Sequence, residues 1–231
     1  MSGGRISASN LTVRPLTPDR WSDLERLFGP RGACGGCWCM WWRETHAEFE
    51  RRKGAGNKRA MSRIVSSGEV PGIIGYIGDE PVAWCSIAPR DRFPRLERSR
   101  ILKRIDDEPV WSVVCFFIAR TYRKLGLSRR MLEQAVLYAA GEGARLVEGY
   151  PVEPKKGKTA DAFAYTGLAQ IFRSAGFAEV ERRSETRPIM RRWTDEGAKS
   201  TGSMEDRGAK RTPGRRSGKG KLSSRKRGSK E

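Results

Sequence analysis

The segment Arg123-Lys-Leu-Gly-Leu-Ser128 links a long apolar run to a helical pattern, and its residue types suit a phosphate ligand. Gly126 and Ser128 are small, so the backbone can approach a ligand closely, and the first amides of a helix have no partner inside it. The turn differs from a dinucleotide GxGxxG and from a Walker loop. We therefore expect either a pyrophosphate-binding turn or an ordinary helix start with basic flanks, which are Arg123, Lys124, Arg129 and Arg130.

Three of the five cysteines fall within Cys34-Gly-Gly-Cys37-Trp-Cys39, a few residues before the single histidine, His46. Together they offer four ligands of the types that zinc accepts, but their uneven spacing disfavours a structural site. A CxxC redox pair is also disfavoured, because no thioredoxin-like context surrounds it. We expect no metal here. The tryptophans of this segment either wall a substrate pocket, where cation–π contacts would hold an amine, or fill the core; they are Trp38, Trp41 and Trp42.

The elements that would position these residues follow from hydrophobic periodicity. The run Val110–Ala119 is apolar almost throughout, which is typical of a strand covered on both faces. Gly78-Asp79 separates two apolar stretches, as in a hairpin. The pattern predicts strands over 11–16, 72–78, 80–87, 110–119, 145–152 and 177–191. It predicts helices over 18–28 and 57–66, a third that begins after Ser128 and ends at Gly141, and a fourth from an N-cap at Thr166 to Gly176. This order predicts an α/β sandwich around a mixed sheet.

The chain is strongly basic, with 46 Lys and Arg against 27 acidic residues among 231, a net charge of +19. Its apolar runs are too short to span a membrane, its N-terminus has no apolar signal core, and its odd number of cysteines is not typical of a disulfide framework. We therefore expect a soluble cytoplasmic protein with reduced thiols and no membrane partner.

The composition changes at Thr194. Residues 194–231 contain 12 Lys and Arg, 5 acidic residues and no aromatic residue. Such a segment cannot bury enough apolar surface to order itself, so we expect a folded domain over 1–193 and a disordered basic tail over 194–231. The tail would either bind nucleic acid, the ribosome or an acidic partner without sequence specificity, or serve only as a solubilising extension.

The apolar strand, the turn and the helix resemble the core motif of the GNAT superfamily of acyl-CoA N-acyltransferases. That motif reads Gln/Arg-x-x-Gly-x-Gly/Ala, and the chain has Arg123-Lys-Leu-Gly-Leu-Ser128, with serine in the last small position. A second signature of the family, an aromatic residue four positions before Gly-Phe, is matched by Phe172 and by Gly176-Phe177. The order of elements over 11–192 agrees as well. The resemblance implies a GNAT-like α/β/α sandwich around a mixed, mainly antiparallel sheet.

The resemblance also implies an N-acetyltransferase that transfers an acetyl group from acetyl-CoA, as cosubstrate, to a primary amine by direct attack on the thioester. The pantetheine arm would run between the strands at 110–119 and 144–151. A backbone N–H of Phe117 or Ile118 would polarise the thioester carbonyl. The pyrophosphate would lie on the amides of Arg123, Lys124, Leu125, Gly126, Leu127, Ser128 and Arg129.

The chain departs from the family pattern at two catalytic positions. Family members often have a tyrosine acid where this chain has Phe172, and a carboxylate base on the strand where it has Ser112. The candidates for base and acid are then Glu148, working through water, and Tyr165 or Tyr150, although all three would also fit as structural residues. The departures leave an alternative function, a catalytically weak GNAT-like binding module docked on nucleic acid or ribosome through its tail. For an enzyme, the acceptor stays open between a small amine, an antibiotic and a protein amine.

Overall fold

The computed structural model of the chain describes residues 7–154 and 165–194. The predicted tail lies outside these residues apart from Thr194. Thr194 is buried, and its hydroxyl donates a hydrogen bond of 3.0 Å to the carbonyl of Ala144. This first residue of the predicted tail is therefore packed against the domain.

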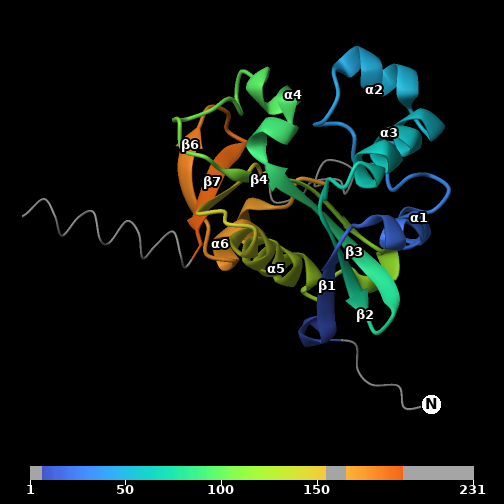
Figure 1. The fold of residues 1–231 in the computed structure, drawn as a ribbon. Helices are drawn as coiled ribbons and strands as arrows, with labels where there is room; N and C mark the ends of the chain where they lie inside the picture. Colours follow the sequence, from blue (N-terminus) through green and yellow to red (C-terminus); the bar gives the residue numbers. More distant parts are fainter. Residues whose placement is uncertain (1–6, 155–164, 195–231) are drawn as a thin grey trace, which may run out of the picture.

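A seven-stranded sheet lies at the centre of the molecule, in the order β1-β2-β3-β4-β5-β7-β6 (Figure 1). Neighbouring strands are antiparallel except β4 and β5, which are parallel. The prediction of a mixed, mainly antiparallel sheet is confirmed. The strands are β1 (Leu11–Pro15), β2 (Ile73–Ile77), β3 (Glu80–Pro89), β4 (Trp111–Ile118), β5 (Leu146–Gly149), β6 (Ala178–Arg182) and β7 (Pro188–Trp193).

Helices cover both faces of this sheet, which is why its strands are apolar on both sides. Ile73, Cys85 and Val113 pack on one face with α5 and α6, whereas Ile74 and Trp84 pack on the other with α1 and α3 (Figure 1). This alternation follows the period of two along a strand. The helices are α1 (Trp21–Phe28), α2 (His46–Arg52), α3 (Ala55–Ser66), α4 (Pro94–Glu97), α5 (Leu127–Gly141) and α6 (Ala169–Ser174). Among the described residues, no helix combines the length and apolarity needed to cross a bilayer.

The C-terminal part of the fold differs from the prediction in two places. The single strand expected over 177–191 is two antiparallel strands, β6 and β7, because the polar residues between them form a turn. The expected N-cap at Thr166 is wrong: α6 begins at Ala169 with Leu168 at its N-cap, since Gly167 has a φ of +87° and interrupts the helical path. Thr166 is fully buried instead.

Helix α2 was absent from the predicted elements, although the sequence carries a signal for it. The Thr45 side chain accepts a hydrogen bond from the Glu48 backbone, and the Glu48 carboxylate accepts one from the Thr45 backbone. This reciprocal capping box has the pattern Thr-x-x-Glu, which is recognisable in a sequence. The helix is short, and only Phe49 within it is buried, so its hydrophobic periodicity is weak.

Candidate functional site

Strands β4 and β5 run side by side for only three residue pairs and then part. The pairs are Trp111–Val147, Ser112–Glu148 and Val113–Gly149, after which β5 ends while β4 continues to Ile118. A bulge in β4, between its pairs with Ser86 and Ile87 of β3, lies at the same level and is a feature common near active sites. We call the stretch from Val114 to Ile118, which has no partner in β5, the open edge of β4.

The backbone amides of the open edge face in two directions. The N–H of Ala119 donates to the Val82 carbonyl of β3 at 2.8 Å, whereas that of Phe116 donates to the Tyr165 carbonyl at 2.6 Å. Because amide directions alternate along a strand, the N–H of Phe117 points toward β3 and that of Ile118 points away from it, on the side where β5 has ended. Of the two amides predicted to polarise a carbonyl, Ile118 has the suitable direction.

The turn after β4 leads directly into α5 and leaves the start of that helix open. Gly126 is its N-cap with φ +79°, Lys124 also has a positive φ of +64°, and no side chain caps the helix. A non-glycine residue in this region of φ is strained, and such strain is concentrated at ligand-binding turns. Leu127 is 1% exposed and anchors the helix start in the core. The unpartnered first amides of α5 therefore face outward from a fixed position.

The charge around this turn suits an anionic ligand. The first turn of α5 contains no acidic residue, and its dipole adds positive potential. Arg123 reaches back to the open edge, where its Nε donates to the Ile118 carbonyl at 3.1 Å. The nearest acid along the helix, Glu133, pairs with Arg129 at 2.8 Å and with Arg130 at 3.4 Å. The seven predicted pyrophosphate-binding residues thus lie together at one helix start, next to the open edge.

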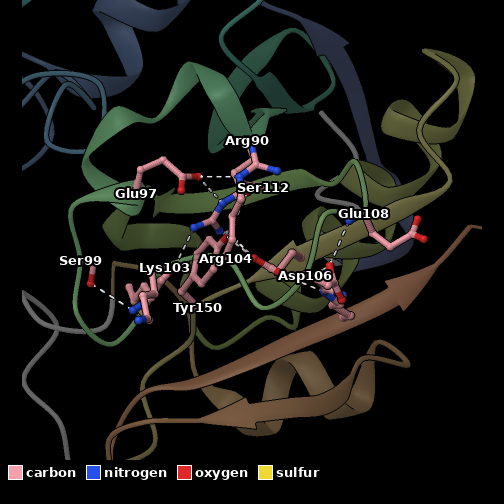
Figure 2. Close-up of polar contacts among 12 residues, drawn as sticks. Arg90, Glu97, Ser99, Lys103, Arg104, Asp106, Glu108, Ser112 and Tyr150 are labelled. Atoms are coloured by element: carbon pink, nitrogen blue, oxygen red, sulfur yellow. Dashed lines mark hydrogen bonds and ion pairs between the residues drawn. The ribbon is translucent and has the colours of Figure 1, made fainter.

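Glu148 and Tyr150, two of the predicted catalytic residues, belong to a buried polar network. Figure 2 shows Arg90, Ser112 and Tyr150 among its members. Glu148 is 1% exposed, and its Oε1 accepts hydrogen bonds from Arg90 at 2.8 Å and from the Tyr150 hydroxyl at 2.6 Å. Its Oε2 accepts a hydrogen bond of 2.7 Å from Arg191. The Tyr150 hydroxyl also lies 2.9 Å from the Ser112 hydroxyl. Both carboxylate oxygens are therefore engaged inside the protein.

The same network ties the long segment between β3 and β4 to the sheet. Besides Glu148, Arg90 binds the Glu97 carboxylate at 2.7 Å and the Leu102 carbonyl at 2.8 Å, and Arg191 binds the Asp106 carboxylate at 2.6 and 2.9 Å. Burial acts to lower the pKa of Arg191, but its contacts with Asp106 and Glu148 outweigh burial and raise it. Burial and the neighbouring Glu148 raise the pKa of Tyr150 well above its usual value, so this phenol stays protonated.

Tyr165, the third predicted catalytic residue, lies at the open edge itself. Its carbonyl accepts the hydrogen bond from Phe116, and its half-buried ring packs beside Cys115 of the same strand. Burial raises the pKa of Tyr165 to about 12, against the opposing effect of Arg187. The phenol is therefore protonated at neutral pH and has a cation near it that would stabilise the phenolate.

Phe172 occupies the position where the resemblance would place a tyrosine acid. It is fully buried and packs against Phe177 and Phe116, with ring centroids 5.0 and 6.1 Å away. Gly149 and Gly167 make room for the ring, because a Cβ at either glycine would lie within 2.7 Å of it. A hydroxyl here would need a hydrogen-bond partner in an apolar environment, so the residue has become part of the core.

The three tryptophans of the cysteine-containing segment have different surroundings. Trp38 is 5% exposed and stacks on Trp21 with ring centroids 6.0 Å apart, and Trp42 is 8% exposed and packs in the core that includes Phe93. Trp41 is half-buried, and the Arg95 guanidinium lies 3.6 Å from its ring centroid. Trp41 is thus the member of the three that retains an accessible face beside a charged group.

The cysteines of this segment point in different directions. Cys34 is exposed, Cys37 is half-buried, and Cys39 is buried with its Sγ accepting a hydrogen bond of 3.2 Å from the Trp84 indole. His46 begins α2 and packs edge-on against Trp41. Within the described residues, no three His, Cys, Asp or Glu side chains are grouped closely enough to hold a metal ion, and all five cysteines are free thiols.

Sequence reasoning missed the arginines that turn inward around the predicted residues. Arg90 directly follows a strand, which is a weak indication that its side chain turns inward. Nothing in the neighbouring sequence distinguishes the other three from arginines at the surface. The inward direction of these three depends on partners 21 to 85 positions away along the chain. The four that bear on the site are Arg90, Arg95, Arg187 and Arg191.

Comparisons with known proteins agree with this architecture. The model of the acetyltransferase (GNAT) family matches residues 36–162, just over half of the chain. A GNAT-family acetyltransferase from Listeria monocytogenes 4b F2365 has the same fold, with a TM-score of 0.50 and 11% identity over 79% of this chain and 94% of that one. An acetyltransferase from Thermus thermophilus gives a TM-score of 0.47 and 18% identity over 81% and 99%. No curated protein matches the chain in sequence. The match to the family model over more than half of the sequence shows that the chain belongs to the GNAT acetyltransferase family.

Proposed function

We propose that this protein is an N-acetyltransferase that transfers the acetyl group of acetyl-CoA to a primary amine by direct attack on the thioester. The observation that carries the proposal is the open edge of β4 beside the uncapped start of α5. The open edge provides the Ile118 amide beside an extended chain, and the start of α5 provides amides and positive charge for a phosphate. Membership of the acetyltransferase family supports the same activity.

The turn between Arg123 and Arg129 fits the pyrophosphate of acetyl-CoA. The first amides of α5 donate to its oxygens, while Arg123 and Lys124 supply countercharge. Gly126 is needed because its φ of +79° is costly for other residues. The Ile118 N–H donates to the thioester oxygen as negative charge develops on it, which stabilises the transition state without a particular side chain. Acetyl-CoA contributes the activated acyl group, and the protein holds it in place.

Tyr165 is the residue we assign to proton donation. As the nitrogen of the neutral amine bonds to the acyl carbon, the carbon–sulfur bond breaks and the nitrogen releases a proton to water. The departing thiolate takes a proton from the Tyr165 phenol. A phenol with a pKa of about 12 remains protonated until that step, and Arg187 stabilises the phenolate that results. Glu148 and Tyr150 act as positioning residues in this scheme, because the Glu148 oxygens are already bound to two guanidinium groups and one phenol.

The alternative of a non-catalytic module docked through a basic tail has no specific observation in its favour. It depends on residues 194–231, of which only Thr194 is described, and the comparisons point to acetyltransferases. Solubility, location in the cytoplasm and binding of nucleic acid therefore stay predictions from the sequence.

Thermal unfolding of the full chain with increasing acetyl-CoA tests the proposal. At 100 times its dissociation constant the ligand adds about 2.7 kcal/mol to the free energy of unfolding, which raises the Tm of a chain of this size by roughly 5–10 °C. Gly126→Val should abolish the rise by straining the turn. Gly143→Val is the matched control, because Gly143 also has a positive φ of +85° but lies at the other end of α5. The absence of any rise for the unmodified protein would contradict the proposal.

A further inference from the structure

Two arginines beside Tyr165 lack the carboxylate partners that accompany buried arginines elsewhere in this protein. Arg90 pairs with Glu148, and Arg191 pairs with Asp106. By contrast, neither Arg95 nor Arg187 has a carboxylate within ion-pair distance in the part of the chain that the structure describes. Among the described residues Arg192 is likewise partly buried without a carboxylate partner, and its Nη1 donates to the Ala175 carbonyl. Arg95 and Arg187 differ from it in lying beside the open edge of β4.

Arg95 is held in place without being neutralised. Its guanidinium stacks on Trp41 at 3.6 Å from the ring centroid, and its Nη1 donates to the Trp41 carbonyl at 2.9 Å. Stacking fixes the plane of a guanidinium and leaves its edge free to bind an oxyanion. Burial lowers the pKa of Arg95, and the carboxylate that opposes this effect, Glu50 of α2, acts from beyond ion-pair distance. The positive charge of Arg95 is therefore incompletely compensated.

Arg187 is held in a similar way. Its Nη1 donates to the buried Thr166 hydroxyl at 2.8 Å and to the Tyr150 carbonyl at 3.3 Å, both of which are uncharged acceptors. Arg187 precedes β7 directly in the sequence, so the sheet fixes its backbone. It therefore supplies a second positioned cation on a different element from Arg95.

Both cations are held by neighbours of Tyr165. Thr166, whose hydroxyl binds Arg187, adjoins Tyr165 in the sequence, and Trp41, on which Arg95 stacks, packs against the same core cluster as the Tyr165 ring. Tyr165 is in turn attached to the open edge of β4 through the hydrogen bond from Phe116. A negatively charged group bound by the two arginines would thus lie close to the strand on which we place the thioester.

We propose that the acceptor is an amine that also carries an oxyanion, a carboxylate or a phosphate, and that Arg95 and Arg187 bind this group beside Tyr165. The inference rests on the proposed function and specifies its substrate class. Guanidiniums bind both kinds of oxyanion through pairs of N–H donors. Binding of the anion would compensate the two charges and direct the amine toward the open edge. The net charge of +19 would also attract such a substrate.

The test compares matched pairs of amines at saturating acetyl-CoA, with release of the CoA thiol as the measurement. Suitable pairs are β-alanine with β-alaninamide, glycine with glycinamide, and 2-aminoethyl phosphate with ethanolamine. A hydrogen-bonded charge pair is worth about 1.5–3 kcal/mol, so at least one oxyanion-bearing amine should exceed its neutral partner by roughly 10–100-fold in kcat/KM. Which pair shows the larger ratio distinguishes a carboxylate from a phosphate.

Variants of the two arginines test whether these residues cause the preference for the oxyanion-bearing amine. Arg95→Met should raise the KM for the oxyanion-bearing amine by about 10-fold or more, while leaving the kinetics of its neutral partner and the acetyl-CoA-dependent rise in Tm unchanged. Arg187→Met should raise the same KM, but it should also lower kcat for both amines, because Arg187 stabilises the Tyr165 phenolate. Arg98→Met is the matched control, since Arg98 is exposed and adjoins the same short helix as Arg95. Binding of N-acetyl-β-alanine and of its amide in the presence of CoA, followed by tryptophan fluorescence, gives a readout that does not need turnover.

The outcomes separate this inference from the proposed function. If acetyl-CoA raises the Tm but the oxyanion-bearing compounds neither react faster nor bind more tightly than their neutral partners, the inference is wrong and the enzyme assignment stands. Equal losses for both members of a pair in Arg95→Met would also overturn it. If acetyl-CoA has no effect on the Tm, the proposed function itself fails.

Discussion

The two sides of the open edge of β4 are built in different ways. On the side of α5, a proposed phosphate site consists of backbone amides and consecutive residues between Arg123 and Arg129, most of them exposed. On the side of Tyr165, the groups come from four separate segments and are side chains: Trp41, Arg95, Tyr165 and Arg187. Beneath that second side lies the buried network around Glu148. Local sequence is sufficient to build the first side, whereas the second exists only when distant segments pack together.

The largest expected effect comes from Glu148→Gln, which removes the anion between two buried guanidiniums. Breaking a buried ion pair by changing one partner costs about 3–5 kcal/mol, and we expect a loss of that size in the free energy of unfolding, measured by urea denaturation. Glu97→Gln is the control, because the Glu97 side chain is 40% exposed and binds the same arginine; its loss should stay below about 1 kcal/mol. A Glu148→Gln protein that is stable but has lost acetyl transfer would instead identify Glu148 as the base. The buried network around Glu148 would then be part of the catalytic site.

Tyr165→Phe should lower kcat by about 100-fold, which is the lower end of general acid catalysis, with little change in KM for acetyl-CoA. The change leaves the side of α5 intact, so kcat should fall while the KM for acetyl-CoA stays the same. Tyr122→Phe is the matched control, since the Tyr122 hydroxyl binds only the exposed Glu80, at 2.9 Å. An equal loss of kcat in both variants would contradict the assignment.

The raised pKa of Tyr165 also predicts a dependence of stability on pH. The folded protein holds this proton to a pKa of about 12, whereas a phenol in the unfolded chain releases it near 10. The stabilisation is therefore complete below about pH 10 and is lost as the pH rises toward 12. The difference in free energy of unfolding between the unmodified protein and Tyr165→Phe should shrink over that interval in denaturation curves.

Lys124→Gly should separate stability from ligand binding on the side of α5. Lys124 has a φ of +64°, a strained conformation that glycine adopts freely. After allowance for the greater freedom of glycine in the unfolded chain, we expect a gain of about 0.5–1 kcal/mol in the free energy of unfolding. Loss of the cation should at the same time weaken acetyl-CoA binding in a ligand titration. A variant that is less stable than the parent would mean that the lysine side chain, and not the ligand, selects this conformation.

The smallest effect is expected at Glu153, whose side chain is 32% exposed. Contacts with Arg173 and Arg182 lower the pKa of this carboxyl to about 2. Because the pKa is lowered, the stabilisation is present above the ordinary value near 4.5 and is lost as the pH falls toward 2. Glu153→Gln should therefore cost less than about 1 kcal/mol at pH 7, and no difference from the unmodified protein should remain at pH 2. If Glu153→Gln lost as much free energy of unfolding as Glu148→Gln, burial would not explain the difference expected between these two carboxylates.

The predictable parts of this protein are those that depend on neighbours in the sequence. The β2–β3 hairpin around Gly78-Asp79, the apolar strand β4 and the turn at Gly126 each rest on the conformational preferences of a few adjacent residues. The start of α6 was misplaced because Gly167, directly after Thr166, has a φ of +87° and lies against the rings of Phe172 and of Phe116, the latter 51 positions earlier in the chain.

By itself, the sequence determined most of the order of elements, the turn that we propose for phosphate binding and the family to which they point, because local hydrophobicity, glycine and charge are properties of short segments. The tertiary structure alone decided that Glu148 is bound by Arg90 and Arg191, that Trp38 and Trp42 are buried while Trp41 is not, and that Arg95 and Arg187 stand beside Tyr165 without an acid among the described residues. The direction and burial of a side chain depend on segments far away in the chain, so they are defined only once those segments have packed.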